Sequence, residues 1–259
     1  MTTKQKVLGI IPARLGSTRI PEKMLKDICG KPLIQRTVER SLKAKSLDAL
    51  IVATDSEQIA DFVRPLGVPV IMTPSELPTG SDRSAAATKL FTDFTPDIIA
   101  TIWGDEPLYP ANVIDGVVQL LLDDPDLQAG IAADKIKDEE MWREQSVVKV
   151  LTDLKNNVLS FSRAPVPYDY KNTHALDLYH VIGVMVTRRE FLFQFLEMQQ
   201  TPLEIREGVE QMRMLENGFR MRVTKGDYGS LGVNTPAELE EVRAMVAARE
   251  GRGNNEKNK

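Results

Sequence analysis

The sequence predicts an α/β fold in which helices flank a mostly parallel central sheet. Two features of its first half predict this fold: short runs rich in β-branched residues alternate with amphipathic segments, and turn signals separate them. The chain has 259 residues, of which 42% are hydrophobic, and this is enough to bury one large core. We therefore expect a single domain over residues 1–250. Residues 251–259 are polar, lack apolar periodicity and are expected to form a disordered tail.

The first half contains four expected strands, at residues 7–12, 49–54, 69–72 and 98–103. Helices are expected at residues 32–45, 56–65, 81–91 and 112–122. Pro32 suits a first helical turn, where its missing N–H costs no hydrogen bond. The segment TDSEQ at residues 54–58 combines a capping residue with acids at a helix start.

After Gly130 the pattern changes, and the sheet is expected to become mixed. Residues 147–153 and 156–161 resemble an antiparallel hairpin, and residues 177–188 a further strand. Helices are expected at residues 189–198 and 203–217, a strand at 219–224, and a last helix capped by Asn234 or Thr235. No repeat or linker divides the chain.

Composition excludes several classes of function. The net charge of −4 argues against a nucleic-acid partner, which normally requires a basic surface. A single cysteine, Cys29, excludes a disulfide framework and favours a reducing compartment, so we expect a cytoplasmic protein. No stretch approaches about 18 unbroken apolar residues, so membrane insertion is not expected.

The stretch IIPARLGSTRIPEKML, residues 10–25, runs from the first strand into a basic loop. Loops at the carboxyl end of a parallel strand are where open α/β sheets bind ligands. Gly16 lets the backbone approach a ligand, while Arg14, Arg19 and Lys23 supply positive charge, so the loop suits a polyphosphate. The alternative is a solvated basic turn. The stretch matches neither the dinucleotide-binding nor the P-loop pattern.

An acid follows the fourth strand, in the stretch IIATIWGDEPLYP. Asp105 is expected at the same sheet edge as the basic loop, where its carboxylate would suit Mg²⁺ beside a triphosphate. The alternative is that Asp105 only begins a turn with Pro107.

Two further stretches offer weaker signals. In PTGSDR, Gly80 permits close backbone approach, Ser81 is a candidate helix cap, and Arg83 is either a donor to a base or sugar or an ordinary surface residue. In GVNTP, Asn234 is either a helix cap or a second oxygen ligand for the metal.

Taken together, the chain resembles the sugar-acid cytidylyltransferases, and within them the 3-deoxy-manno-octulosonate (Kdo) cytidylyltransferases. The resemblance covers roughly residues 6 to 247, because its motifs follow one another in the family's order. They are IIPARLGSTRIPEKML, GKPLIQRTVERS, IVATDSEQIA, PTGSDR, WGDEPLYP, VVKVLTD, FSRAPVPYD, PLEIREGVEQMRMLENG and GVNTPAELEEVR.

The resemblance implies a Rossmann-like nucleotidyltransferase fold with an antiparallel dimerisation region. Residues 1–130 would form the nucleotide-binding half and residues 131–225 the sugar-binding and dimerisation region. The implied enzyme is a cytoplasmic homodimer of lipopolysaccharide biosynthesis. With Mg²⁺ as cofactor, it would transfer CMP from CTP to the anomeric hydroxyl of a 3-deoxy sugar acid and release pyrophosphate.

The resemblance also implies roles for single residues. The catalytic residues would be Arg14, Lys23 and Asp105, and the metal ligands Asp105 and Asn234. The nucleotide would be bound by Pro12, Ala13, Arg14, Gly16, Ser17, Lys23, Gly80 and Arg83. The sugar would be bound by Trp103, Arg163, His180, Glu207, Glu210 and Gln211.

Three positions depart from the family's pattern. Trp103 replaces the usual glutamine, which removes an amide near the sugar and adds bulk. His180 stands three residues before Gly183, where the family has the shorter HLG. Asn234 replaces an aspartate, which keeps an oxygen ligand and drops a charge.

Three alternatives stay open, the first two because of these departures and the third because glycosyltransferase folds also place an acid at a strand end. The first is a CMP transferase for another acid, such as 8-amino-Kdo, a nonulosonate or a phosphonate. The second is a catalytically silent nucleotide-binding homologue. The third is a glycosyltransferase that uses a nucleotide-sugar donor, against which the basic loop argues.

Overall fold

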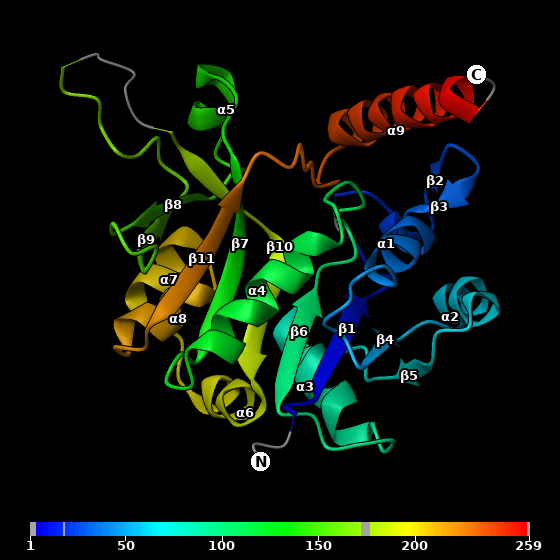
Figure 1. Cartoon of the computed structure of the whole chain (residues 1–259), viewed down its shortest axis with the longest axis horizontal. Coiled ribbons are helices and arrows are strands. Elements are labelled where there is room, and N and C mark those ends of the chain that lie inside the picture. Colours follow the sequence, from blue (N-terminus) through cyan, green and yellow to red (C-terminus); the bar gives the residue numbers. More distant parts are fainter. Residues whose placement is uncertain (1–3, 18, 172–176, 258–259) are drawn as a thin grey trace.

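The structure is a computed structural model, and it describes residues 4–17, 19–171 and 177–257, the side chains of 252–257 excepted. Its central sheet runs in the order β11-β7-β10-β6-β1-β4-β5, and β8 and β9 attach to it at β10 (Figure 1). The strands of this sheet are β1 (Val7–Ala13), β4 (Ala49–Thr54), β5 (Val70–Met72), β6 (Ile98–Ile102), β7 (Ala129–Lys135), β8 (Lys149–Thr152), β9 (Val158–Ser162), β10 (Tyr179–Arg188) and β11 (Met221–Gly226). A separate small hairpin pairs β2 (Asp27–Ile28) with β3 (Lys31–Pro32).

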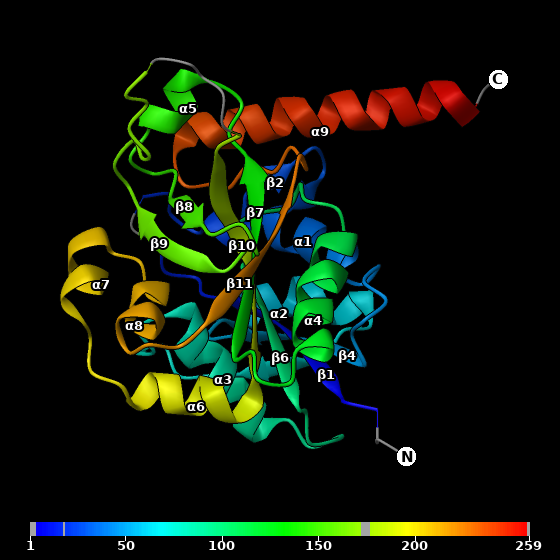
Figure 2. The same cartoon turned by 60° about the vertical axis from the view of Figure 1, so that its left-hand side comes forward.

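Helices cover both faces of the sheet. Figure 2 shows α4 and α1 on one side and α3 and α6 on the other. No helix in the described ranges is both long and apolar enough to cross a membrane. The helices are α1 (Leu33–Ser41), α2 (Glu57–Val63), α3 (Gly80–Leu90), α4 (Asn112–Asp123), α5 (Glu139–Arg143), α6 (Arg189–Glu197), α7 (Pro202–Glu207), α8 (Gln211–Glu216) and α9 (Pro236–Lys257), with short 3₁₀ turns at Lys23–Leu25 and Arg64–Leu66.

The strand β1 explains why the centre of the sheet is parallel and buried. All seven of its residues are buried. Leu8 and Ile10 pack in the cluster that contains α3 and α6 residues, whereas Val7 and Ile11 pack in the cluster on the opposite face. Such a strand must be covered on both sides, which helical crossovers between parallel strands provide. β1 pairs in parallel with β4 and β6, as the sequence predicts.

The second half of the sheet is mixed, again as predicted. β10 is antiparallel to both of its neighbours, β6 and β7, and β8 and β9 form the expected antiparallel hairpin. The β10–β7 pairing is irregular: β10 advances from Ile182 to Met185 while β7 advances only from Ala132 to Ile131. The irregularity follows His180, so the face on which His180 lies does not follow from simple alternation along the strand.

The hairpin of β2 and β3 and the helix α5 were not predicted, and three further differences have a clear physical reason. The expected helix at residues 203–217 is two helices, because Gly208 takes a left-handed conformation (φ 62°) that ends α7. The strand β7 was not predicted, since its sequence AGIAADK contains few of the β-branched residues that mark strands. The polar segment 251–257, expected to be disordered, continues α9, where each added residue extends an existing helix without a new nucleus. Residues 258–259 lie outside the described residues.

Candidate active site

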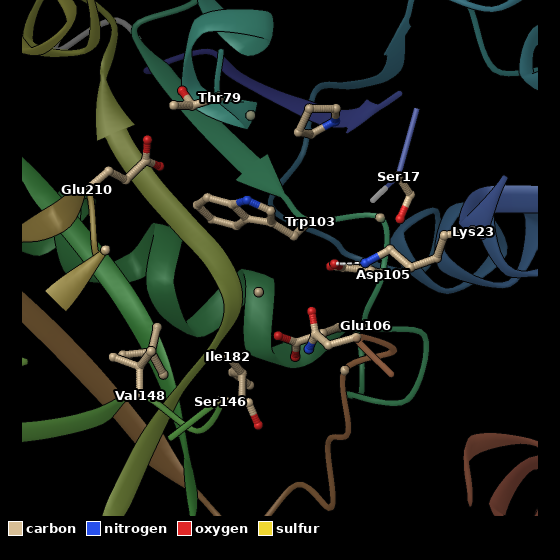
Figure 3. Close-up of a pocket in the computed structure, with 18 of the residues that line it drawn as sticks. Ser17, Lys23, Thr79, Trp103, Asp105, Glu106, Ser146, Val148, Ile182 and Glu210 are labelled. Carbon is tan, nitrogen blue, oxygen red and sulfur yellow. Dashed lines mark hydrogen bonds and ion pairs between the residues drawn. The ribbon is translucent and has the colours of Figure 1, made fainter. Parts of the chain in front are cut away.

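One cavity of about 550 Å³ opens at the carboxyl ends of β1 and β6 and extends between β10, β8 and α8. This volume is within the range of small-molecule sites. Figure 3 shows Lys23, Asp105 and Ser17 at one end of it, Glu210 and Thr79 at another, and Trp103 between them. The two halves of the chain therefore meet at one site.

The basic loop forms one wall of the cavity, and buried anchors hold it there. Ile20 and Met24 are buried, whereas Arg14 and Arg19, which precede them in the loop, are exposed. At the start of the loop, the backbone N–H of Leu15 donates to Asp55 Oδ1 at the end of β4 (3.1 Å). The start of the loop is thus tied to the sheet, while Arg14 and Arg19 remain exposed to solvent.

Lys23 and Asp105 meet in the cavity, as the shared sheet edge predicts. Lys23 Nζ lies 2.7 Å from Asp105 Oδ2, and both side chains are mostly buried. The two residues come from different loops, which become neighbours because β1 and β6 pair in parallel. This ion pair brings opposite charges together at the point where the sequence predicts a phosphate and a metal.

Asn234 lines the same end of the cavity, and its side chain does not cap the helix α9. The cap of α9 is Thr235, whose Oγ1 accepts from the Glu238 N–H (3.2 Å), while the Glu238 carboxylate accepts from the Thr235 N–H (2.7 Å). Asn234 Oδ1 instead accepts from Arg19 Nη2 (3.3 Å). Of the two alternatives for Asn234, the cap is therefore wrong.

Arg83 also lines the cavity, and it is buried, so the alternative of an ordinary surface residue is wrong. Its guanidinium donates to Thr73 Oγ1 (2.5 Å) and pairs with Asp55 (3.2 Å). Asp55 therefore holds both Arg83 and the start of the basic loop. The cap of α3 is Thr79, which forms a capping box with Asp82, and not Ser81.

Trp103 occupies the middle of the cavity and is closely enclosed by glycines. A Cβ atom on Gly80 would come within 3.1 Å of Trp103 Nε1, and one on Gly183 within 3.1 Å of Trp103 Cβ. Both distances are too short for a larger residue to be accommodated without displacing its neighbours. The indole ring of Trp103 thus forms a flat apolar surface between the two ends of the cavity (Figure 3). A smaller side chain at this position would leave that space open.

Two buried polar groups face the cavity at its other end. Glu210 Oε1 accepts from Ser81 Oγ (2.6 Å), and its Oε2 is buried with no partner in good hydrogen-bond geometry among the described residues, although the nearby Thr79 hydroxyl favours the ionised carboxylate. Burial raises the pKa of Glu210. His180 Nδ1 lies 3.2 Å from the Val181 carbonyl oxygen, which requires the proton on Nδ1 and leaves the buried Nε2 as an acceptor with no partner in the part of the chain that the structure describes. Burial lowers the pKa of His180, so the neutral form is favoured.

Arg163 and Glu207 have structural partners that the sequence does not reveal. The guanidinium of Arg163 lines the cavity but donates to the carbonyl oxygens of Gln145 (2.9 Å), Glu207 (2.6 Å) and Gly208 (3.3 Å). The Glu207 carboxylate accepts from Ser162 Oγ and from the Arg163 N–H. Glu207 is not among the residues that line the cavity, so in this structure it supports β9 and does not face a ligand.

Glu106 was not singled out from the sequence, although it follows Asp105 directly. It lines the cavity, accepts from Ser230 Oγ (2.9 Å) and receives a hydrogen bond from the Gly183 backbone. Burial, together with the carboxylates of Asp105 and Asp134, raises the pKa of Glu106 to about 7. No signal in the sequence pointed to Glu106. Its contact with the Gly183 backbone lies beside the irregular pairing of β10, which is visible only in the structure.

Most of the residues singled out from the sequence meet in this cavity. Ala13 is buried at the end of β1 and, like Glu207, does not line it. The predicted site residues that do line it are Pro12, Arg14, Gly16, Ser17, Lys23, Gly80, Arg83, Trp103, Asp105, Arg163, His180, Glu210, Gln211 and Asn234.

Comparisons with known sequences agree with this geometry. The family described as Cytidylyltransferase matches residues 8–223. Proteins named 3-deoxy-manno-octulosonate cytidylyltransferase are similar over most of the chain. The one from Geobacter metallireducens is 41% identical and the alignment covers 92% of this chain and 96% of the relative. The one from Bdellovibrio bacteriovorus is 41% identical, with coverage of 94% and 98%.

Comparisons with solved structures give the same result. A structure of CMP:2-keto-3-deoxy-manno-octonic acid synthetase complexed with CTP matches with a TM-score of 0.85 and 33% identity, covering 95% of this chain and all of the other. A 4-diphosphocytidyl-2C-methyl-D-erythritol synthase from Anaerococcus prevotii matches with a TM-score of 0.62 and 16% identity, covering 94% and 99%, and shares the fold alone. The chain is therefore a nucleotidyltransferase that belongs to the 3-deoxy-manno-octulosonate cytidylyltransferase family.

Proposed function

We propose that this protein transfers CMP from CTP to the anomeric hydroxyl of Kdo and releases pyrophosphate, with Mg²⁺ as cofactor. The observation that carries the proposal is the Lys23–Asp105 pair, which joins a basic loop to an acid inside one cavity. The names of the relatives and the CTP-bound neighbour support the choice of CTP and Kdo.

The nucleotide end would be formed by the basic loop and α3. Arg14, Ser17 and Lys23 would bind the triphosphate, and the segment around Arg83 would contact the cytidine. Arg14 is exposed, and among the described residues the Lys23 ammonium is paired with Asp105, so both have N–H donors that can turn to phosphate oxygens. Positive charge placed in this way stabilises the charge that develops on the α-phosphate and on the departing pyrophosphate.

The donor set at this end fits Mg²⁺. In phosphate chemistry this ion is usually held by one or two protein oxygens together with phosphate and water. Asp105 and Asn234 supply two such oxygens, and Asp105 already attracts a cation, the Lys23 ammonium. Groups of three or more acidic, histidine or cysteine side chains that could bind a metal are absent from the described residues, which agrees with a site completed by the substrate. The metal, when bound, would polarise phosphate oxygens.

The acceptor end would bind the sugar acid between Trp103 and the buried polar groups. The unpartnered Glu210 Oε2 can accept from a sugar hydroxyl, and so can His180 Nε2. Such contacts would align the anomeric hydroxyl for in-line attack on the α-phosphate. The chain's contribution is then orientation and charge, and no covalent intermediate is required.

A second candidate is CMP transfer to a different acid, and Trp103 is the observation that favours it. The indole offers a flat apolar wall where the family's glutamine offers an amide. An acceptor that differs from Kdo at the position facing this wall would therefore bind differently.

We further propose a homodimer formed through the region of residues 131–225. This region exposes six large apolar or aromatic side chains: Leu154, Leu159, Tyr168, Tyr170, Leu203 and Ile205. Exposed apolar surface of this kind is typical of protein interfaces.

The function predicts a defined substrate requirement. Pyrophosphate release should be fastest with CTP and Kdo, and should stop when Mg²⁺ is removed by EDTA. The measurement is coupled pyrophosphate release over four nucleotides and a panel of acids. Turnover with another acid at least about tenfold more efficient than with Kdo would establish the second candidate, and CTP binding without turnover on any acid would contradict both.

Removing the charge of Lys23 should reduce catalysis strongly. Lys23→Ala is expected to lower kcat by about a hundredfold or more, the size of effect seen when a group that stabilises transition-state charge is lost. Lys26→Ala is the matched control, because Lys26 follows in the same segment and does not line the cavity. Near wild-type turnover in the Lys23 variant, with an intact fold by circular dichroism, would show that the assigned role is wrong.

The Lys23–Asp105 pair predicts that CTP and Mg²⁺ bind cooperatively. The metal alone would leave the Lys23 ammonium beside a second cation, and the triphosphate alone would face the Asp105 carboxylate. Together the two ligands satisfy both residues. Calorimetry should show CTP binding at least about tenfold tighter with Mg²⁺ than with EDTA, and Lys23→Met should weaken the coupling. Equal CTP affinity in both conditions would count against shared use of the pair.

The proposed dimer has a simple test. Light scattering on a sizing column should give twice the mass of the chain, and Leu159→Lys should shift the protein towards the monomer. Leu90→Lys, at an exposed site at the end of α3, is the control and should leave the mass unchanged. A monomeric wild-type protein would exclude the proposal.

A further inference from the structure

Lys149, on β8, is a fully buried lysine outside the residues that line the cavity. Its side chain is among the largest fully buried ones in the described part of the chain. Its Nζ donates to three backbone carbonyl oxygens: Glu144 (2.7 Å), Val147 (2.9 Å) and Arg163 (2.9 Å). An ammonium has three N–H donors, so every donor of Lys149 is used.

The partners of Lys149 are unusual for a buried charge. Lys149 takes part in none of the ion pairs found among the described residues; its direct partners are main-chain carbonyls, and the Glu144 and Glu207 carboxylates act on its charge only at longer range. Burial lowers the pKa of Lys149, which reflects the cost of keeping the charge away from water. An apolar side chain at this position would avoid that cost. What an apolar side chain would lose is the connection between the three carbonyl groups.

These three carbonyl groups belong to two segments that form one wall of the cavity. Ser146, Val147 and Val148 line it from the segment before β8, and Arg163 lines it from the end of β9. Figure 3 shows Ser146 and Val148 on the side of Ile182, away from Lys23 and Asp105. Lys149 therefore connects the segment 144–147 to the end of β9 by hydrogen bonds, from the side of the wall that faces away from the cavity.

The connection continues towards the other acceptor residues. Arg163 Nη1 donates to Gln145, and its other nitrogens donate to the carbonyls of Glu207 and Gly208. The turn at residues 207–210 carries Glu210 into the cavity. Lys149 and Arg163 thus link β8, β9 and the α7–α8 turn. The nucleotide end is built from other elements, namely the basic loop, the start of α3 and the loop after β6.

We propose that Lys149 is a positioning residue for the acceptor: through its three carbonyl contacts it holds the wall formed by residues 144–148 and Arg163 in the shape that receives the sugar acid. The proposal rests on the proposed function of the cavity. It implies that loss of the Lys149 donors impairs binding of the acid and leaves binding of CTP intact.

The test compares Lys149→Met, which keeps the length and removes the donors, with Val150→Ala as a control for damage to the fold. Val150 is the next residue of β8 and packs in a hydrophobic cluster. Lys149→Met should raise the KM for Kdo at least about tenfold and change the KM for CTP less than about twofold. Val150→Ala should lower the unfolding temperature and leave both KM values within about twofold.

Hydrogen exchange supplies a second readout that does not depend on turnover. The amides of residues 144–148 should exchange faster in Lys149→Met than in the wild type, and Val150→Ala should not reproduce this change. Wild-type protein that releases no pyrophosphate with Kdo would contradict the proposed function, and the exchange experiment would still test the wall. Unchanged exchange, or a KM change shared equally by Kdo and CTP, would overturn the role of Lys149.

A second variant, Lys149→Gln, retains part of the donor set and should give a smaller rise in the KM for Kdo. If both Lys149 variants fail to fold, Lys149 is needed for the stability of the whole fold and not specifically for the shape of the acceptor wall. That result overturns the proposal.

Discussion

The ion pair between Lys23 and Asp105 is the contact on which the architecture of the site depends. It requires β1 and β6 to be parallel neighbours, because only then do the loops that follow them leave the same edge of the sheet. It also requires the basic loop to be anchored, which the buried Ile20 and Met24 achieve on the sheet side. A mostly buried pair of this kind persists only where its surroundings keep the two charges together. The fold therefore holds these two opposite charges, to which we assign the triphosphate chemistry, close to one another inside the cavity.

The two ends of the cavity are built on different principles. At the nucleotide end, charged side chains such as Arg14 and Arg19 are exposed and can move to meet a flexible triphosphate. At the other end, which we propose binds the acceptor, Glu210 Oε2 and His180 Nε2 are buried without hydrogen-bond partners among the described residues. A buried polar atom without a partner is costly, so it strongly favours a ligand that supplies the missing hydrogen bond. The first end can tolerate variation in geometry, and the second is suited to discriminate between similar sugars.

The sequence predicted the parallel half well and the mixed half partly, for physical reasons. Buried parallel strands are dense in β-branched residues, and their carboxyl ends share one edge, so the meeting of Lys23 and Asp105 could be predicted. The strand β7, rich in alanine, carries no such signal. Sequence also cannot tell whether an arginine donates to a ligand or to the backbone, and Arg163 and its neighbour Glu207 proved to have backbone partners. Glu106 was missed because its partners, Ser230 and the Gly183 backbone, come from distant segments.

The irregular pairing of β10 with β7 has a consequence for how this protein and its relatives can diverge. In a regular strand, inserting or deleting one residue rotates every later side chain to the opposite face and would expose the core. Here the irregular stretch between Ile182 and Met185 divides the β10–β7 pairing into two regular parts, one up to Ile182 and one from Met185 onward. The chain can therefore change its length at this point while Met185 and Thr187 keep their registers. Evolution can in this way alter the contour of the cavity beside β10 by insertion as well as by substitution, at little expense to folding.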